Sequence, residues 1–134
     1  MRGFTLLFAV LFVSATLALS LGLSNLIIGQ IRLSGSGRDS QFAFYAADSG
    51  AECATYWDRS GNKFSTSSAS NIVCAGQSRS VGGAPTSSFN LDFTNGSCVS
   101  VGVNKSNPAE TVITSIGHSP CNGRRVERGL EVRY

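Results

Sequence analysis

The most constraining feature of this chain is a long uncharged segment at its start. Residues 3–31, between Arg2 and Arg32, contain no charged side chain. A helix of about 20 apolar residues is long enough to cross the hydrocarbon core of a bilayer. A helix that is apolar on all sides also needs lipid or other helices around it. We therefore predict a helix over residues 4–33 that lies in a membrane or in a bundle of helices.

A cleavable secretory signal is the main alternative for this segment. The sequence "ALS" at residues 18–20 resembles a signal peptidase site, and the apolar region of a signal peptide spans only about 7 to 15 residues. Here the apolar run continues through Leu21, Leu26 and Ile31, so cleavage at that point would leave half of a hydrophobic helix on the mature protein. Retention is therefore favoured. The positive start of the chain predicts a cytoplasmic N-terminus and an exported C-terminal domain.

The number and spacing of the four cysteines are consistent with export of the C-terminal domain. Cys53, Cys74, Cys98 and Cys121 are widely spaced and form no C-x-x-C pair, which argues against a zinc site. An even number of cysteines beyond a membrane-directing segment indicates two disulfides in an oxidising compartment. Three pairings are open, as is a set of four free thiols. We favour Cys53 with Cys74 and Cys98 with Cys121, since each closes a loop worth about 3 kcal/mol.

The helical pattern continues beyond the uncharged segment. In residues 34–57 one stripe of apolar or small residues recurs at alternating steps of four and three, as in an amphipathic helix: Phe42, Ala46, Ser49, Cys53 and Tyr56. The sequence "SGSG", Ser34 to Gly37, lies between the two halves, and each interior glycine destabilises a helix by about 1 kcal/mol relative to alanine. We expect the helix to bend or melt locally there and to end near Trp57.

Residues 58–134 are predicted to form an antiparallel sheet. Serine- and glycine-rich residues 60–88 indicate a long loop with one short strand at Asn71 to Ala75. "SSFNLDF" and "CVSVGV" alternate apolar and polar residues around "NGS", which predicts a β-hairpin. A three-residue loop, Asn95 to Ser97, would set Phe93 opposite Val99 and Leu91 opposite Val101.

Two further strands complete the predicted sheet. They are "TVITSIG", Thr111 to Gly117, and "RVERGLEVRY", in which one face holds Val126, Leu130, Val132 and Tyr134. A sheet with one apolar face can bury it against the apolar stripe of the helix. The fold class is therefore α+β, with a long N-terminal helix packed on a C-terminal antiparallel sheet.

Signals of catalysis are weak. The one histidine, His118, precedes Cys121 in "GHSPC", where a surface or sheet-edge role is favoured over a cysteine and histidine pair. The formal net charge of +3 is small, and Glu127 and Glu131 alternate with the arginines near the C-terminus, as on a solvated strand face. We expect no enzyme, no cofactor and no metal, and the charge does not argue for nucleic acid as a partner.

The start "RGFTLL", the apolar helix after it, and the stretch "QFAFYAADSGAECATYWD" together resemble the type IV pilin and pseudopilin family. The resemblance implies a leader of residues 1–3, cut by prepilin peptidase between Gly3 and Phe4, with methylation of the new amino group of Phe4. It also implies a filament-core helix, which includes Phe4, Leu7, Phe8, Leu11, Gly22 and Gly29. The partners would be other pilin subunits, and the chain would pass from the inner membrane to a cell-surface filament.

The chain departs from the family pattern at the fifth residue after the cut. The family usually has glutamate there, and this chain has Phe8. Subunits that lack this glutamate tend to be minor ones at the filament tip, so the resemblance implies a minor or tip subunit. A pseudopilin of a type II secretion system and a membrane-anchored binding domain that does not polymerise are the alternatives. Adhesion, motility, DNA uptake and secretion stay open as tasks.

Overall fold

The computed structural model describes residues 2–123 and 126–134. A single helix, α1 (Arg2–Gly61), is followed by six strands: β1 (Ala69–Cys74), β2 (Gln77–Gly82), β3 (Thr86–Asp92), β4 (Cys98–Asn104), β5 (Val112–Ser119) and β6 (Val126–Arg133). The chain divides into two compact units, with the boundary between Gly35 and Ser36. We call residues 3–35 the N-terminal helix segment and the unit from Ser36 onward the head domain.

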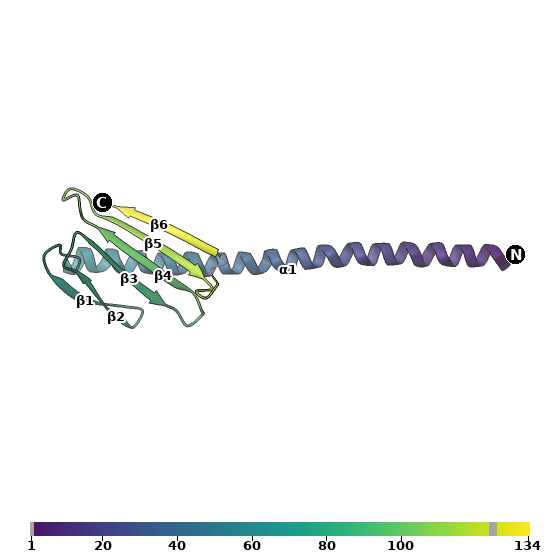
Figure 1. Cartoon of the computed structure of the whole chain (residues 1–134), viewed down its shortest axis with the longest axis horizontal. Coiled ribbons are helices and arrows are strands. Elements are labelled where there is room, and N and C mark those ends of the chain that lie inside the picture. Colours follow the sequence, from purple (N-terminus) through teal and green to yellow (C-terminus); the bar gives the residue numbers. More distant parts are fainter. Residues whose placement is uncertain (1, 124–125) are drawn as a thin grey trace. The chain divides into compact units, whose positions relative to one another are not determined.

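The head domain contains two antiparallel sheets (Figure 1). Strands β3, β4, β5 and β6 form a four-stranded sheet in chain order, and β1 and β2 form a separate hairpin. Side chains of β2 cover the outer edge of β3: Gln77 Nε2 donates to the Asp92 carbonyl oxygen at 2.6 Å, and Arg79 Nε donates to that of Asn90 at 2.7 Å. These side chains satisfy backbone acceptors that an edge strand would otherwise expose.

The part of α1 in the head domain packs on the four-stranded sheet, so the predicted α+β class is confirmed. The contact is made by small residues on one helical face, which are Ala43, Ala46, Ala47, Gly50, Ala51 and Ala54. A Cβ added at Gly50 would lie 2.7 Å from Val101 Cγ2, and the Ser115 hydroxyl donates to the Ala47 carbonyl at 2.6 Å. The helix backbone thus lies directly against the sheet.

The buried face differs from the predicted stripe. Ser49 is exposed, and Tyr56 is 62% exposed, although both were expected to face the core. Ala43, Ala47 and Ala54 are fully buried instead. The reason is steric: a helix that approaches a sheet this closely must present its smallest side chains, which leaves no room for a tyrosine.

The core of the head domain lies between this helical face and the sheet. Its largest fully buried apolar side chains are Phe64, Ile72, Leu91, Val99, Val101 and Ile113. The Phe64 and Phe89 rings also pack there, with centroids 6.1 Å apart. Alternation of buried and exposed residues along β3 and β4 matches the predicted inner face.

The hairpin register was predicted wrongly by two residues. Leu91 pairs with Val99 and Phe89 with Val101, whereas Phe93 was expected opposite Val99. The Phe93 amide donates to the Ser97 carbonyl at 2.9 Å, so the three loop residues are 94–96. Gly96 has a φ of 81°, the left-handed position that such a loop requires, and the loop is therefore built around this glycine.

Residues 60–88 are more ordered than predicted. The expected strand at Asn71 to Ala75 corresponds to β1, but β2 was missed and no long loop is present. Ala75 and Gly76, with φ of 49° and 75°, form the two-residue turn between β1 and β2. β2 has a single apolar core residue, Val81, and its pairing depends on β1 rather than on its own sequence pattern.

The local melting of α1 that was expected at "SGSG" is wrong, because residues 34–37 are helical. The helix also ends later than predicted, at Gly61 rather than near Trp57. Asn62, with a φ of 45°, follows the last helical residue. In the predicted leader and last strand, Met1 and Arg125 lie outside the described residues, as does Arg124 of the arginine-rich stretch.

Candidate functional site

The N-terminal helix segment is the first candidate site, because its apolar side chains are all exposed. Their exposed fractions range from 50% at Phe8 to 76% at Leu33. The best 18-residue window has a mean hydropathy of 2.4, and none of it is buried within the described chain. The described residues thus contain one helix that is long and apolar enough to cross a membrane, which is consistent with membrane anchoring.

Three hydroxyl groups of this segment donate hydrogen bonds within the helix itself. Ser14 Oγ donates to the Leu11 carbonyl at 2.9 Å, and Thr16 Oγ1 donates to the Val13 carbonyl at 2.9 Å. Ser24 Oγ donates to the Ser20 carbonyl at 3.0 Å. Such bonds satisfy polar groups without water, so these hydroxyls are compatible with an apolar environment.

The residues that the family resemblance assigns all lie on α1. Gly3 and Phe4 are in its first turn, Leu7 and Leu11 are 58% and 57% exposed, and Phe8 lies between two other aromatic rings. The ring centroids of Phe4 and Phe8 are 5.7 Å apart, and those of Phe8 and Phe12 are 5.6 Å apart. Phe8 is therefore part of an aromatic row along the helix.

The two glycines of the segment, Gly22 and Gly29, have open space around them. A Cβ added at either position would meet no atom within 4 Å. Small residues on an apolar helix allow the backbone of another helix to approach closely. The head domain already shows such an approach at Gly50, but with the partner supplied by the chain itself.

The four cysteines form the pairing that the sequence favoured. The Cys53–Cys74 disulfide joins α1 to β1, with Cα atoms 6.0 Å apart, and Cys98–Cys121 joins β4 to the segment after β5, with Cα atoms 5.6 Å apart. Both disulfides lie in the head domain. They fix its loops to the helix and the sheet.

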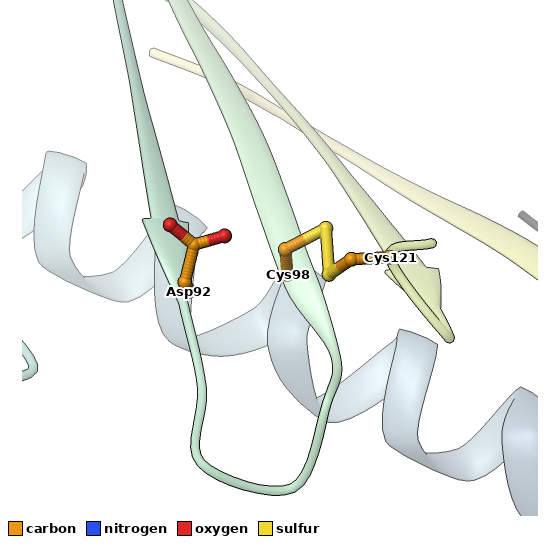
Figure 2. Close-up of side chains that lie close together, drawn as sticks. All are labelled: Asp92, Cys98 and Cys121. Atoms are coloured by element: carbon orange, nitrogen blue, oxygen red, sulfur yellow. A yellow bond between two sulfur atoms is a disulfide. The ribbon is translucent and has the colours of Figure 1, made fainter. Parts of the chain in front are cut away.

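One group of side chains has the spacing of metal ligands. Ligand atoms of Asp92, Cys98 and Cys121 lie within 4.8 Å of one another (Figure 2). Figure 2 also shows that the two sulfur atoms are bonded to each other. Metal ions bind cysteine as the thiolate, which a disulfide does not offer, so the group does not make a metal centre in this state.

His118 lies elsewhere than predicted. It is 8% exposed and belongs to β5, an inner strand, where its backbone neighbours are Cys98 on β4 and Glu127 on β6. The sheet-edge prediction was wrong because β5 extends to Ser119 and pairs with β4 on one side of His118 and with β6 on the other. His118 Nδ1 lies 3.1 Å from Glu127 Oε1, and Cys121 is in a disulfide, so no cysteine and histidine pair exists.

A buried carboxylate that the sequence did not reveal holds the end of the helix. Asp58 is 8% exposed, its Oδ1 lies 2.5 Å from Lys105 Nζ, and the Tyr134 hydroxyl donates to its Oδ2 at 2.9 Å. Arg59 stacks over the Tyr134 ring at 4.4 Å. Burial, and then the hydrogen bond to Asp58, raises the pKa of the Tyr134 hydroxyl to about 12. This contact joins α1, the loop after β4 and the end of β6.

Comparisons of the chain with models of protein families, with curated proteins and with solved structures found no match. Two structural features therefore bear on its function, the exposed apolar helix and the disulfide-bonded head domain.

Proposed function

We propose that this protein is a structural subunit of a type IV pilus or a pilus-like filament, and that it polymerises through the N-terminal helix segment. The observation that supports this most is the uniform exposure of that segment, from Phe4 to Leu33. A helix that is apolar on its whole circumference is stable only in lipid or among other helices. The start "RGFTLL" and the stretch "QFAFYAADSGAECATYWD", which resemble pilins, favour other helices as the final environment.

In this proposal the two environments follow each other. The chain first sits in the inner membrane with its head domain exported, and prepilin peptidase then cuts between Gly3 and Phe4. After the cut, apolar helices of neighbouring subunits replace the lipid around the segment. Gly22 and Gly29 leave room for close helix contacts in this bundle.

We further propose a minor or tip role for the subunit. In related filaments a glutamate at the fifth mature position is thought to meet the amino terminus of a neighbour. Phe8 at this position has no charge and packs between Phe4 and Phe12. A subunit without this ion pair suits a place where no subunit lies ahead of it.

Quantitative proteomics of filaments sheared from the native host tests the proposal. We expect the chain in the filament fraction, at a small fraction of the main subunit. A Gly3→Leu variant, which alters the residue before the cut, should stay in the membrane fraction. A Gly35→Leu variant has the same substitution outside the cleavage motif and should still enter filaments.

Other outcomes would reject parts of the proposal. If the wild-type chain stays in the membrane fraction, it is an anchored binding domain that does not polymerise. If it is the most abundant filament protein, the minor role is wrong. If its deletion stops secretion of exported enzymes while surface filaments persist, the subunit belongs to a secretion pseudopilus.

A further inference from the structure

An open pocket in the head domain lies beside the Cys53–Cys74 disulfide. Its volume is about 460 Å³. The lining comes from α1, from β1 and the turn after it, and from the end of β3, and it includes Glu52, Tyr56, Trp57, Val73, Ala75 and Phe93. Tyr56 and Val73 are 62% and 56% exposed, so the pocket opens to solvent.

Aromatic rings form part of the pocket wall and are held in place. Tyr56 and Trp57 pack edge to face, with centroids 5.4 Å apart. The indole N–H of Trp57 donates to the Val73 carbonyl at 3.1 Å, and this bond fixes the ring against β1. The neighbouring Cys53–Cys74 disulfide holds α1 and β1 together. The pocket is thus preformed, because its walls do not depend on a ligand for their position.

The pocket carries an unneutralised negative charge. Glu52 is exposed and, among the described residues, has neither an ion pair nor a hydrogen bond. Asp48 lies four residues before it on the same helix, and like charges at this spacing destabilise a helix by a few tenths of a kcal/mol. A cation bound at Glu52 would relieve this repulsion.

Four arginines that the structure describes in the head domain make contacts elsewhere. Arg59 stacks on Tyr134, and Arg79 donates to the Asn90 carbonyl. Arg128 donates to Ser40, and Arg133 donates to Glu131. No described basic side chain forms an ion pair with Glu52, so its carboxylate is accessible to a cation from another molecule.

The turn at the rim of the pocket is part of the β1–β2 hairpin. Ala75 and Gly76, with φ of 49° and 75°, adopt the left-handed conformation that a two-residue turn of this kind requires. Ala75 lines the pocket, so the hairpin fixes this part of its rim.

We propose that this pocket binds an arginine or lysine side chain of a partner protein. The cationic group would lie against the rings of Tyr56 and Trp57, where a cation is attracted to the aromatic face, and would pair with Glu52. A side chain that projects from a second protein can enter because the pocket is open. The proposal concerns the head domain alone and does not require that the chain forms a filament.

Trp57 makes the test direct, because it is the only tryptophan of the chain. The full chain, in non-ionic detergent micelles, is titrated with N-acetyl-arginine amide while tryptophan fluorescence is followed. The control probe is N-acetyl-citrulline amide, which has nearly the same shape without the charge. We expect a saturable change with the arginine probe and at least a fivefold weaker response to citrulline.

Two matched variants locate the interaction. Glu52→Gln should weaken binding of the arginine probe by up to about fivefold. Asp39→Asn removes the same charge from the same helix outside the pocket and should leave binding unchanged. Both side chains are at least partly exposed, and near-ultraviolet circular dichroism checks that each variant is folded.

Three results would overturn the proposal. The first is no saturable change with the arginine probe, and the second is an equal response to the citrulline probe or in Glu52→Gln. The third is tighter binding of glucosamine than of the arginine probe, since that would identify an amino sugar, rather than a protein side chain, as the ligand.

Discussion

The two units of this chain use apolar side chains in opposite ways. In the N-terminal helix segment large apolar residues such as Phe8 and Leu33 remain at least half exposed. In the head domain, alanines and one glycine of the same helix are buried against the sheet, and the large side chains that fill the core come from the strands and from Phe64. The head domain thus completes its own packing, whereas the N-terminal segment must complete it with another molecule.

This difference predicts which property of the protein a substitution in each unit should change. Changes to the head domain should alter its free energy of unfolding. Changes to the N-terminal segment should alter anchoring or assembly and leave the unfolding of the head domain unchanged. The predictions below test this separation, and each is measured on the full chain in detergent micelles.

The largest expected effect is that of Gly117→Val. A Cβ at Gly117 would overlap the Ala43 carbonyl oxygen and lie 2.8 Å from the Ala47 nitrogen, and these backbone atoms cannot move aside without separating α1 from the sheet. We expect a loss of more than about 3 kcal/mol in the free energy of unfolding, measured by urea denaturation.

Gly22→Val is the matched change in the N-terminal segment. A Cβ there meets nothing within 4 Å, so the unfolding midpoint of the head domain should stay unchanged. Equal midpoints for Gly117→Val and the wild type would refute the close packing of α1 on the sheet. A lowered midpoint for Gly22→Val would show that the two units are not independent.

The second effect concerns the disulfide between α1 and β1. Cys53 and Cys74 are 21 residues apart, and a loop of this size predicts a loss of about 3 kcal/mol when both are replaced by serine. The free energy of unfolding should fall by this amount at neutral pH. The same double replacement should also increase the mobility of the aromatic pocket, measured as greater quenching of Trp57 fluorescence by acrylamide.

Replacement of Cys98 and Cys121 by serine is the control for pocket mobility. That disulfide closes a loop of similar length, 23 residues, but lies outside the pocket. It should lower stability by a similar amount and leave the quenching of Trp57 unchanged. Equal quenching in both double variants would mean that the Cys53–Cys74 disulfide does not hold the pocket.

The smallest effect is a dependence of stability on alkaline pH. The pKa of Tyr134 is raised to about 12 in the folded state, and that of an unfolded tyrosine is about 10. The unfolded state therefore loses its proton first, so the contribution of Tyr134 is fully present below pH 10 and is lost as the pH rises towards 12. Because the side chain is partly exposed, we expect about 1 kcal/mol after solvent screening.

Tyr134→Phe provides the comparison for this pH dependence. The variant keeps the ring that Arg59 covers and removes the hydroxyl that donates a hydrogen bond to Asp58. Its stability should fall less than that of the wild type between pH 9 and pH 11.5, measured by urea denaturation. If the two proteins lose the same stability over this range, the Tyr134 contact does not contribute.

Much of the fold could be predicted from the sequence, because hydrophobic periodicity is a local property. The long helix follows from the uncharged apolar run of residues 3–31 and from the steps of three and four after it. The strands near β3 to β6 and their inner face follow from the alternation of residues such as Leu91, Val99 and Val101. The buried helical face could not be predicted in the same way. Alanine is compatible with both a buried and an exposed position, and the sheet decides which alanines it covers.

The remaining errors have a similar cause. β2 contains little apolar pattern and pairs only because β1 is beside it, and the hairpin register depends on the left-handed conformation of Gly96. The Asp58 contact and the pocket at Glu52 join residues that are far apart in the sequence. A single sequence gives no signal for such contacts.

The measurement that most directly tests the central claim is the intact mass of the protein from its native host, together with the sequence of its N-terminal peptide. The account predicts a chain that begins at N-methylated Phe4, with a further loss of four hydrogens for the two disulfides. A chain that begins at Met1 or near Leu21 would contradict it, because the helix would then be only an anchor or a discarded signal.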